Sequence, residues 1–183
     1  MKASSTELPE VFLLEPRVFG DDRGYFFESH NQRDFEQATG ANVTFVQDNQ
    51  SRSKKNVLRG LHYQNPQAQG KLVRVLAGEI YDVVVDVRRS SPRFKRWVGV
   101  RLSSANKLAI WVPAGFAHGF LVLSDSAEVL YKTTDYWSPE NERCIRWDDA
   151  SLGITWPIDG TPILSAKDAQ GMTLLDAETY SYP

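Results

Sequence analysis

Residues 112–123, VPAGFAHGFLVL, hold the pattern that best indicates how this chain folds. An apolar run ends at Val112, and it is followed by Pro113 and Gly115, two residue types that make tight turns. A second apolar run begins directly after the turn and carries His118 near its start. The stretch therefore predicts a strand, a tight turn and a second strand that presents a histidine.

Similar short apolar runs, separated by turn residues, extend in both directions from this stretch. In residues 79–88, EIYDVVVDVR, a tyrosine and three valines alternate with positions that include Asp82 and Asp86, so the pattern predicts one apolar and one polar face. The other expected strands are GYFFESH (24–30), NVTFVQDN (42–49), NVLRGLHYQ (56–64), KLVRVLAG (71–78), RWVGVRL (96–102), KLAIWVP (107–113), HGFLVLSD (118–125) and EVLYKTTDYW (128–137).

Many short strands with Gly, Pro and Asn between them are typical of a β-sandwich or barrel. One clear helix is expected within residues 31–40, NQRDFEQATG, where Asn31 is the N-cap and Gly40 the stop. Strands and helices do not alternate, so a parallel α/β sheet is disfavoured. No repeat or linker marks a boundary, and we therefore expect a single domain over residues 1–183.

The composition excludes several classes of protein. The 183 residues are 42% hydrophobic and 24% charged, with a net charge of −2, which argues against a broadly basic nucleic-acid binder. No apolar run is long enough to cross a membrane, and the N-terminal residues do not resemble a secretory signal. A single cysteine, Cys144, forbids an internal disulfide and fits a reducing compartment. We therefore expect a cytoplasmic protein.

The turn and histidine of residues 112–123 resemble the second motif of the cupins, which are double-sheet jelly rolls. The resemblance implies an all-β, cupin-like jelly-roll barrel with a few short helices. In metal-binding cupins a first motif supplies two histidines one residue apart, which alternation places on the same side of a strand. The matching segment here is His62-Tyr63-Gln64, which lacks the second histidine. We therefore expect no metal, and a metal-dependent oxygenase is disfavoured.

Without a metal, His62 is a candidate general base, because an unperturbed imidazole titrates near neutral pH. Such a base needs a group, usually a carboxylate, that fixes its tautomer and stabilises the cation that it becomes. Asp82, Asp86 and Asp168 are candidates for this carboxylate. Their spacing from His62 does not choose between them.

Seven blocks of sequence resemble the dTDP-4-dehydrorhamnose 3,5-epimerase family, and they occur in the order expected of it. The members of this family are metal-free cupins of dTDP-L-rhamnose synthesis. The resemblance covers roughly residues 5–176. The blocks are FGDDRGYFFES, FVQDNQSRSKKNVLRGLHYQ, QGKLVRVLAGEIYDVVVDVRRSSP, VPAGFAHGFLVLS, LYKTTDYWSPENE, IRWDD and LSAKD.

The family resemblance implies a 6-deoxy-4-keto sugar, carried on thymidine diphosphate, as the substrate. Its C4 ketone acidifies the hydrogens on C3 and C5, so a base, an opposed acid and a donor near the ketone oxygen suffice without a cofactor. By this resemblance His62 is the base, Asp168 orients it and Tyr131 is the acid. Lys71 is our candidate for stabilising the enolate oxygen. Nearby cations are expected to lower the pKa of Tyr131.

The diphosphate calls for arginines, because a guanidinium matches phosphate oxygens in geometry, and Arg23 and Arg59 are the expected clamps. Regular alternation would turn Arg59 and His62 to opposite sides of their strand, so we expect a bulge at Gly60 to turn both toward one cavity. Tyr136 or Trp137 is expected to stack on the thymine. The family pattern also places these residues at the nucleotide-sugar site: Glu28, Gln47, Asn49, His118, Glu142 and Lys167.

A homodimer is expected because pairing between subunits protects exposed edge strands. The family resemblance further suggests that the segment around Arg23–Glu28 reaches into the partner's site. Two other functions stay open on the sequence: an epimerase that inverts only C3 or only C5, and a non-catalytic cupin that binds sugar nucleotides. Single residues also have structural alternatives, since Tyr131 fits a core position and Asp168 fits the N-cap of a short helix.

Overall fold

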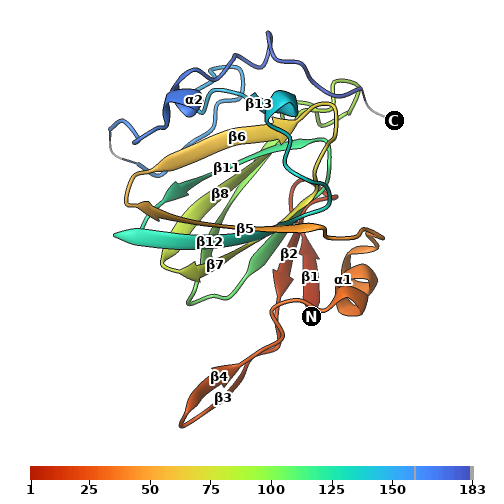
Figure 1. The fold of residues 1–183 in the computed structure, drawn as a ribbon, viewed down its shortest axis with the longest axis vertical. Helices are drawn as coiled ribbons and strands as arrows, with labels where there is room; N and C mark the ends of the chain where they lie inside the picture. The colour runs from red at the N-terminus through yellow and green to blue at the C-terminus, as the bar shows by residue number, and fades with distance from the viewer. Residues whose placement is uncertain (159, 182–183) are drawn as a thin grey trace.

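The computed structural model describes residues 1–158 and 160–181, most of which lie in or between antiparallel strands (Figure 1). Two sheets face each other across a hydrophobic core, as the predicted all-β jelly roll requires. The larger sheet has six strands, which are, in their order across the sheet, β1 (Lys2–Ser5), β2 (Phe12–Glu15), β10 (Ala109–Val112), β7 (Lys71–Ala77), β12 (Ser126–Thr133) and β5 (Gln47–Lys54).

The second sheet has five strands, and a separate two-stranded hairpin projects away from both sheets (Figure 1). The hairpin consists of β3 (Phe19–Asp21) and β4 (Gly24–Phe26). The five strands are, in sheet order, β13 (Glu142–Cys144), β6 (Leu58–Gln64), β11 (Phe116–Val122), β8 (Glu79–Asp86) and β9 (Trp97–Ser103).

The helix predicted within residues 31–40 is confirmed as α1 (Gln32–Thr39). The Asn31 side chain accepts a hydrogen bond from the backbone of Asp34, and Gly40 ends the helix with a φ of 71°, a left-handed conformation. The other described helices are α2 (Ala166–Ala169) and the single 3₁₀ turn η1 (Pro139–Asn141). Neither α-helix has the length and apolar character that crossing a membrane requires.

The strand predicted over residues 42–49 is placed too early, because β5 begins only at Gln47. Val43 and Phe45 pack instead against Phe35 and Trp111, on the outer face of the six-stranded sheet. Their apolar side chains are therefore partly buried in the cluster that includes Phe35 of α1, although these residues do not form a strand.

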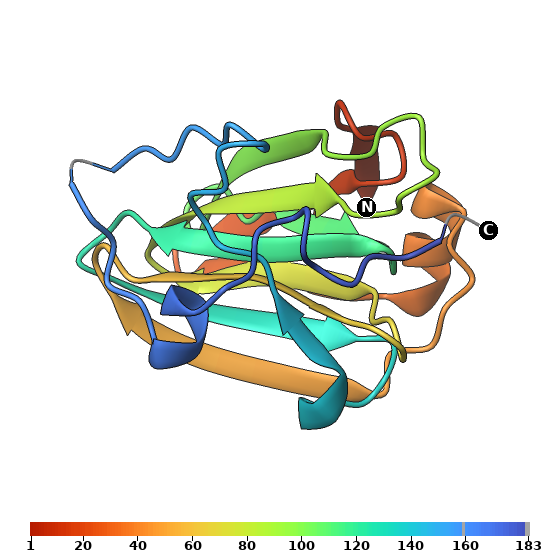
Figure 2. The ribbon, with the colours of Figure 1, turned by 90° about the horizontal axis from the view of Figure 1, so that it is seen from above.

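The alternation predicted for residues 79–88 is confirmed, but the face that carries Asp82 and Asp86 is not exposed to solvent, because both faces of β8 are buried. Val84 and Ile80 lie in the core between the sheets, and Val83 and Val85 belong to a second core on the outer face. The segment that follows β13 covers this outer face, where it contributes Trp156 and other apolar side chains (Figure 2). The same segment contains α2, which contacts β6.

Candidate active site

A cavity of about 290 Å³ opens between the two sheets, at one end of the core. It brings together most of the candidate residues, although they are spread over more than a hundred positions of sequence. Its lining consists of Asn49, Ser51, Arg59, His62, Tyr63, Gln64, Gln69, Lys71, His118, Gly119, Phe120, Tyr131, Trp137, Glu142 and Lys167.

The bulge expected at Gly60 is confirmed. His62 pairs with His118 across β6 and β11, whereas Arg59 pairs with Phe120, so three steps along β6 match two along β11. Gly60 has a φ of 117°, and an added Cβ would lie 2.6 Å from the Cα of Gly119. The extra residue lets both Arg59 and His62 line the cavity.

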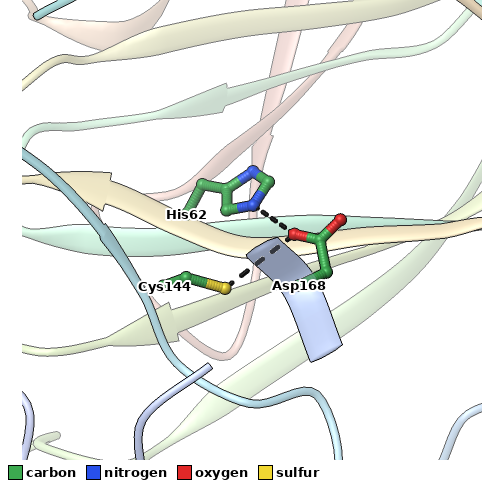
Figure 3. Close-up of side chains that lie close together, drawn as sticks. All are labelled: His62, Cys144 and Asp168. Carbon is green, nitrogen blue, oxygen red and sulfur yellow. Dashed lines mark hydrogen bonds and ion pairs between the residues drawn. The ribbon is translucent and has the colours of Figure 1, made fainter. Parts of the chain in front are cut away.

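His62 is bonded to Asp168, which decides between the three carboxylates that the sequence left open. The Nε2 atom of His62 lies 2.5 Å from Oδ1 of Asp168, and the other ring nitrogen points away from this carboxylate (Figure 3). Asp86 instead holds the guanidinium of Arg88 at 2.7 Å. Asp82 bonds His118, as described below.

The carboxylate of Asp168 is held ionised by its surroundings. Burial by itself would raise the pKa of Asp168, but hydrogen bonds from His62 and Ser165 lower it to about 2. Ser165 is the N-cap of α2 and also donates its hydroxyl to Oδ2 of Asp168, at 2.7 Å. Asp168 is therefore not the N-cap, and an ionised Asp168 requires that Nε2 of His62 carry the proton, which leaves Nδ1 as an acceptor.

A second pair of the same kind lies next to the first. Nε2 of His118 is 2.8 Å from Oδ2 of Asp82, a carboxylate that is completely buried in β8. Burial raises the pKa of Asp82, and the neighbouring His118 opposes this rise. The Gln64 side chain, at the cupin metal position, donates to the carbonyl of Gln67 and accepts from the backbone of Ser138. The Gln64 amide, where metal-binding cupins carry their second histidine, is thus hydrogen-bonded to two backbone groups.

The opposite wall of the cavity comes from the six-stranded sheet. Tyr131 of β12 pairs with Asn49 of β5 on one side and with Val73 of β7 on the other. Paired residues point to the same side of a sheet, and Val73 lies in the core between the sheets, so Tyr131 also faces inward. The phenol of Tyr131 and the imidazole of His62 therefore approach the cavity from facing sheets.

Two ionisable side chains on this wall, Tyr131 and Lys71, have shifted pKa values, and the pKa of Tyr131 does not shift in the predicted direction. Burial raises the pKa of Tyr131, and the positive charge of Arg59 offsets only part of that rise, so the expected lowering is wrong for the unliganded chain. Lys71 is only 7% exposed, and burial lowers its pKa to about 8. A lysine with this pKa is mostly protonated at pH 7, and it places a poorly hydrated cation in the cavity.

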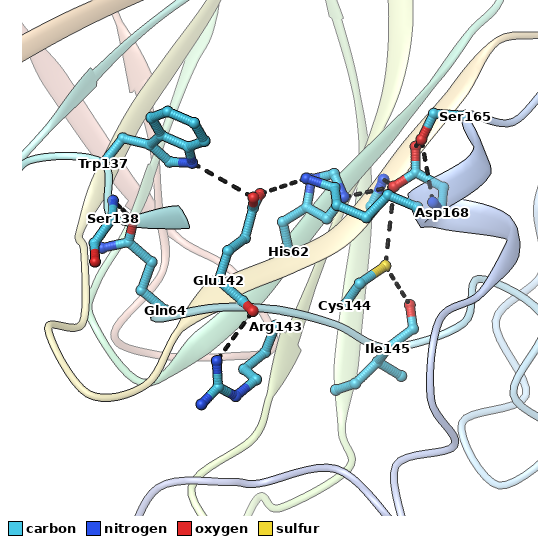
Figure 4. Close-up of polar contacts among 12 residues, drawn as sticks. His62, Gln64, Trp137, Ser138, Glu142, Arg143, Cys144, Ile145, Ser165 and Asp168 are labelled. Carbon is cyan, nitrogen blue, oxygen red and sulfur yellow. Dashed lines mark hydrogen bonds and ion pairs between the residues drawn. The ribbon is translucent and has the colours of Figure 1, made fainter. Parts of the chain in front are cut away.

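The rim of the cavity carries an ion pair and an aromatic ring. Nζ of Lys167 lies 2.6 Å from Oε1 of Glu142, and the Trp137 indole donates to the same carboxylate at 3.4 Å (Figure 4). Burial raises the pKa of Glu142, but its contact with Lys167 lowers it more, and the net direction is downward. Glu142 lies between Trp137 and His62, as Figure 4 shows.

Five candidates do not line the cavity of this chain. One of them is Asp168, which reaches the cavity only through its hydrogen bond to His62. Arg23 lies at the tip of the projecting hairpin, where its side chain is 90% exposed and bonds Asp21. Glu28 accepts a hydrogen bond from Asn31, also outside the cavity. Gln47 donates to the lining residue Asn49 at 2.8 Å, and Tyr136 is 61% exposed.

Sequence reasoning missed several cavity residues. Gln64 follows His62 by two positions on β6 and therefore points to the same side of the strand, so alternation could have identified it. Gln69 precedes Lys71 in a loop, and Phe120 follows His118 by two positions on β11. Outside the lining, no sequence pattern pointed to Cys144, which pairs with His62 across β13 and β6.

The profile of the family described as dTDP-4-dehydrorhamnose 3,5-epimerase matches residues 5–176. An enzyme of that name from Pseudomonas aeruginosa is 63% identical over 180 residues, covering 98% of this chain and 99% of the relative. One from Salmonella typhimurium is 60% identical over 165 residues, or 90% of each chain.

Solved structures agree with this assignment. The dTDP-6-deoxy-D-glucose-3,5-epimerase of Legionella pneumophila, in complex with dTDP-4-keto-L-rhamnose, superposes with a TM-score of 0.97. It is 49% identical, and the match covers 100% of this chain and 98% of that one. A 3′-monoepimerase from Streptomyces bikiniensis is similar at a TM-score of 0.88 and 34% identity, covering 96% and 88%. This chain belongs to the dTDP-4-dehydrorhamnose 3,5-epimerase family.

Proposed function

We propose that this protein inverts C3 and C5 of dTDP-4-dehydro-6-deoxy-D-glucose, giving dTDP-4-dehydro-L-rhamnose for dTDP-L-rhamnose biosynthesis. The observation that carries the proposal is the placement of His62, backed by Asp168, and Tyr131 on facing walls of one cavity. Inversion at carbon requires that a proton leave one face and return to the other, and two opposed groups meet that requirement. The names and ligand of the relatives supply the substrate class.

His62 acts as the base in this scheme. Its Nδ1 atom takes a proton from C3 or C5, and the electron pair of the broken C–H bond moves onto the C4 ketone oxygen as an enolate. The imidazolium that forms keeps its Nε2–H bond to the ionised Asp168, which stabilises the new positive charge.

Lys71 and His118 are the groups proposed to stabilise the enolate. Both lie in the cavity wall, and a buried ammonium acts strongly on a developing negative charge because little water screens it. Tyr131 then donates its phenolic proton to the opposite face of the carbon. Before the second inversion, the imidazolium of His62 releases its extra proton to solvent and the phenolate takes one from solvent. All these steps use protein side chains.

The nucleotide is proposed to lie toward the rim. Arg59 is held by Ser53, at 2.9 Å from its Nε, which leaves its terminal nitrogens for the diphosphate. Asn49, Gln47, Glu142 and Lys167 are proposed to bind the sugar and nucleotide, and the half-exposed rings of Trp137 and Tyr136 to contact the thymine.

We further propose that the protein is a homodimer in which the β3–β4 hairpin of each subunit completes the cavity of the other. In the hairpin, Tyr25 is 63% exposed and Phe26 is 68% exposed, which is unusual for neighbouring aromatic residues on the surface of a monomer. Arg23 and Glu28, which the family pattern assigns to the nucleotide-sugar site, lie outside the cavity of their own chain.

Exchange in deuterated water tests the chemistry. The expected result is deuterium at both C3 and C5, whereas exchange at one carbon only would identify a mono-epimerase and no exchange a binding protein. His62→Ala should reduce exchange at both carbons by about 10³-fold. Tyr131→Phe should still exchange but form little inverted product, because the base remains and the acid is lost. The matched control, Tyr81→Phe on the outer face of β8, should behave as the parent protein.

A mixing experiment tests the shared cavity. Arg23→Ala and His62→Ala are each expected to be nearly inactive alone. When the two variants are combined and allowed to exchange subunits, half of the dimers contain one subunit of each variant. In each of these heterodimers, one of the two cavities has both an intact His62 and an intact hairpin. Activity should then recover to about a quarter of the parent value. If the mixture were as inactive as its components, the shared site would be contradicted. The same holds if light scattering showed a monomer under conditions in which the protein is fully active.

A further inference from the structure

Three potential metal ligands meet behind the imidazole of His62, on the side away from its Nδ1 atom (Figure 3). His62 comes from β6, Cys144 from β13 and Asp168 from α2. Nε2 of His62 lies 2.5 Å from Oδ1 of Asp168, and Sγ of Cys144 lies 3.9 Å from the same oxygen. All three ligand atoms lie within 4.8 Å of one another.

The chemistry of this set matches a borderline transition cation. Imidazole, thiolate and carboxylate together favour Zn²⁺ over Mg²⁺ or Ca²⁺, which select oxygen ligands. Tetrahedral Zn²⁺ needs its ligand atoms roughly 3.3–3.7 Å apart. The sulfur–oxygen distance is close to that value, and the nitrogen–oxygen pair must open by about 1 Å.

The carboxylate of the set is already prepared for a cation. Ser165 donates to Oδ2 of Asp168, and this contact directs Oδ1 toward the other two ligand atoms. Outer hydrogen bonds of this kind orient metal ligands in proteins. Burial and the charge of Asp168 raise the pKa of Cys144 to about 12, so the thiol is protonated and unreactive until a cation arrives.

We propose that His62, Cys144 and Asp168 form an inhibitory site for Zn²⁺ or a similar transition cation, distinct from the metal positions of other cupins. The cation takes the place of the proton between Nε2 and Oδ1. The thiol of Cys144 loses its proton to solvent, and a solvent molecule completes four ligands.

Inhibition follows from the tautomer of His62. A neutral imidazole that binds a metal through Nε2 carries its one proton on Nδ1. Nδ1 is then a donor and no longer accepts a proton from carbon. Because Cys144 is not part of the cavity lining, the cation lies behind the wall and leaves the substrate its space. The expected signature is a lower kcat with an unchanged KM.

Binding is tested with Co²⁺, which replaces Zn²⁺ and reports its ligands by absorption. The parent protein should show the thiolate-to-cobalt charge-transfer band, and Cys144→Ala and Cys144→Ser should lose it. Two variants are used so that misfolding of one does not decide the result. If both Cys144 variants gave the same Co²⁺ spectrum as the parent protein, the proposed site would be overturned. This readout does not depend on the proposed function.

Inhibition is tested by epimerase kinetics with Zn²⁺, and this part rests on the proposed role of His62 as the base. Zn²⁺ should lower kcat reversibly, with recovery on addition of EDTA, and Mg²⁺ should not. Cys144→Ala should keep the parent kcat without metal but need about tenfold more Zn²⁺ or more for half-inhibition. Equal sensitivity of parent and variant, as chelation of Zn²⁺ by the substrate diphosphate would give, would overturn the proposal.

Discussion

Replacement of Lys71 by methionine is expected to stabilise the unliganded protein and, at the same time, to remove most of its activity. Lys71 is buried in the cavity wall, where burial lowers its pKa from 10.5 to about 8. The folded protein therefore holds a cation that would be more stable in the water around the unfolded chain. Methionine has a similar shape and carries no charge.

The size of the effect follows from the two pKa values. At about 1.4 kcal/mol per pKa unit, a fall from 10.5 to about 8 costs the folded state about 3 kcal/mol. Below pH 8 the lysine is protonated in both states, so the full cost applies. As the pH rises from 8 toward 10.5, the folded protein releases the proton first and the cost fades. The advantage of Lys71→Met is thus largest at neutral pH and small above pH 10.5.

Urea unfolding at pH 7 and at pH 10 measures this difference, and deuterium exchange measures activity. We expect a higher unfolding midpoint for Lys71→Met at pH 7 and a much smaller gain at pH 10. The control is Lys2→Met, whose side chain is 76% exposed and whose replacement should change stability by less than about 0.5 kcal/mol.

Two results would refute this reasoning. If Lys71→Met were less stable than the parent at pH 7, the ammonium would not be a buried, poorly solvated charge. If the variant were more stable but retained kcat within a few-fold, Lys71 would not stabilise the enolate, although the electrostatic argument would stand.

Other substitutions test the remaining parts of the site. Asp168→Asn should lower kcat about 50-fold and leave the affinity for dTDP unchanged. The hydrogen bonds that lower the pKa of Asp168 from 3.8 to about 2 amount to roughly 2–3 kcal/mol. A kcat within threefold of the parent value would count against the pairing of His62 with Asp168. The stability from this ionised carboxylate is present above pH 3.8 and lost as the pH falls toward 2, so acid unfolding curves of parent and Asp168→Asn should converge there. Gly60→Ala should destabilise by about 3 kcal/mol or more, because its Cβ would meet the backbone of Gly119, whereas Gly153→Ala, with a φ of 60° and open space, should cost only about 1 kcal/mol in the same urea assay.

The sequence predicted the central strands well because their apolar runs and turn residues are local signals. It placed residues 42–49 in a strand, and it did not show that both faces of residues 79–88 are covered; the two shortcomings have one cause. Apolar side chains are buried by whatever packs on them, here α1 for Phe45 and the segment after β13 for Val83 and Val85. Periodicity records that a side chain is apolar but not which partner covers it.

The sequence alone determined the alternating strands, the cap of α1, the bulge at Gly60 and the presence of His62 at the first cupin motif without a second histidine. Only the tertiary structure decided which carboxylate serves which imidazole, because His62 and Asp168 are 106 positions apart and spacing holds no information across that distance. It also placed Tyr131 on the facing sheet and Cys144 beside the dyad. Ionisation was decided there as well, since the pKa values of Lys71 and Tyr131 follow from burial, which exists only after the sheets have packed.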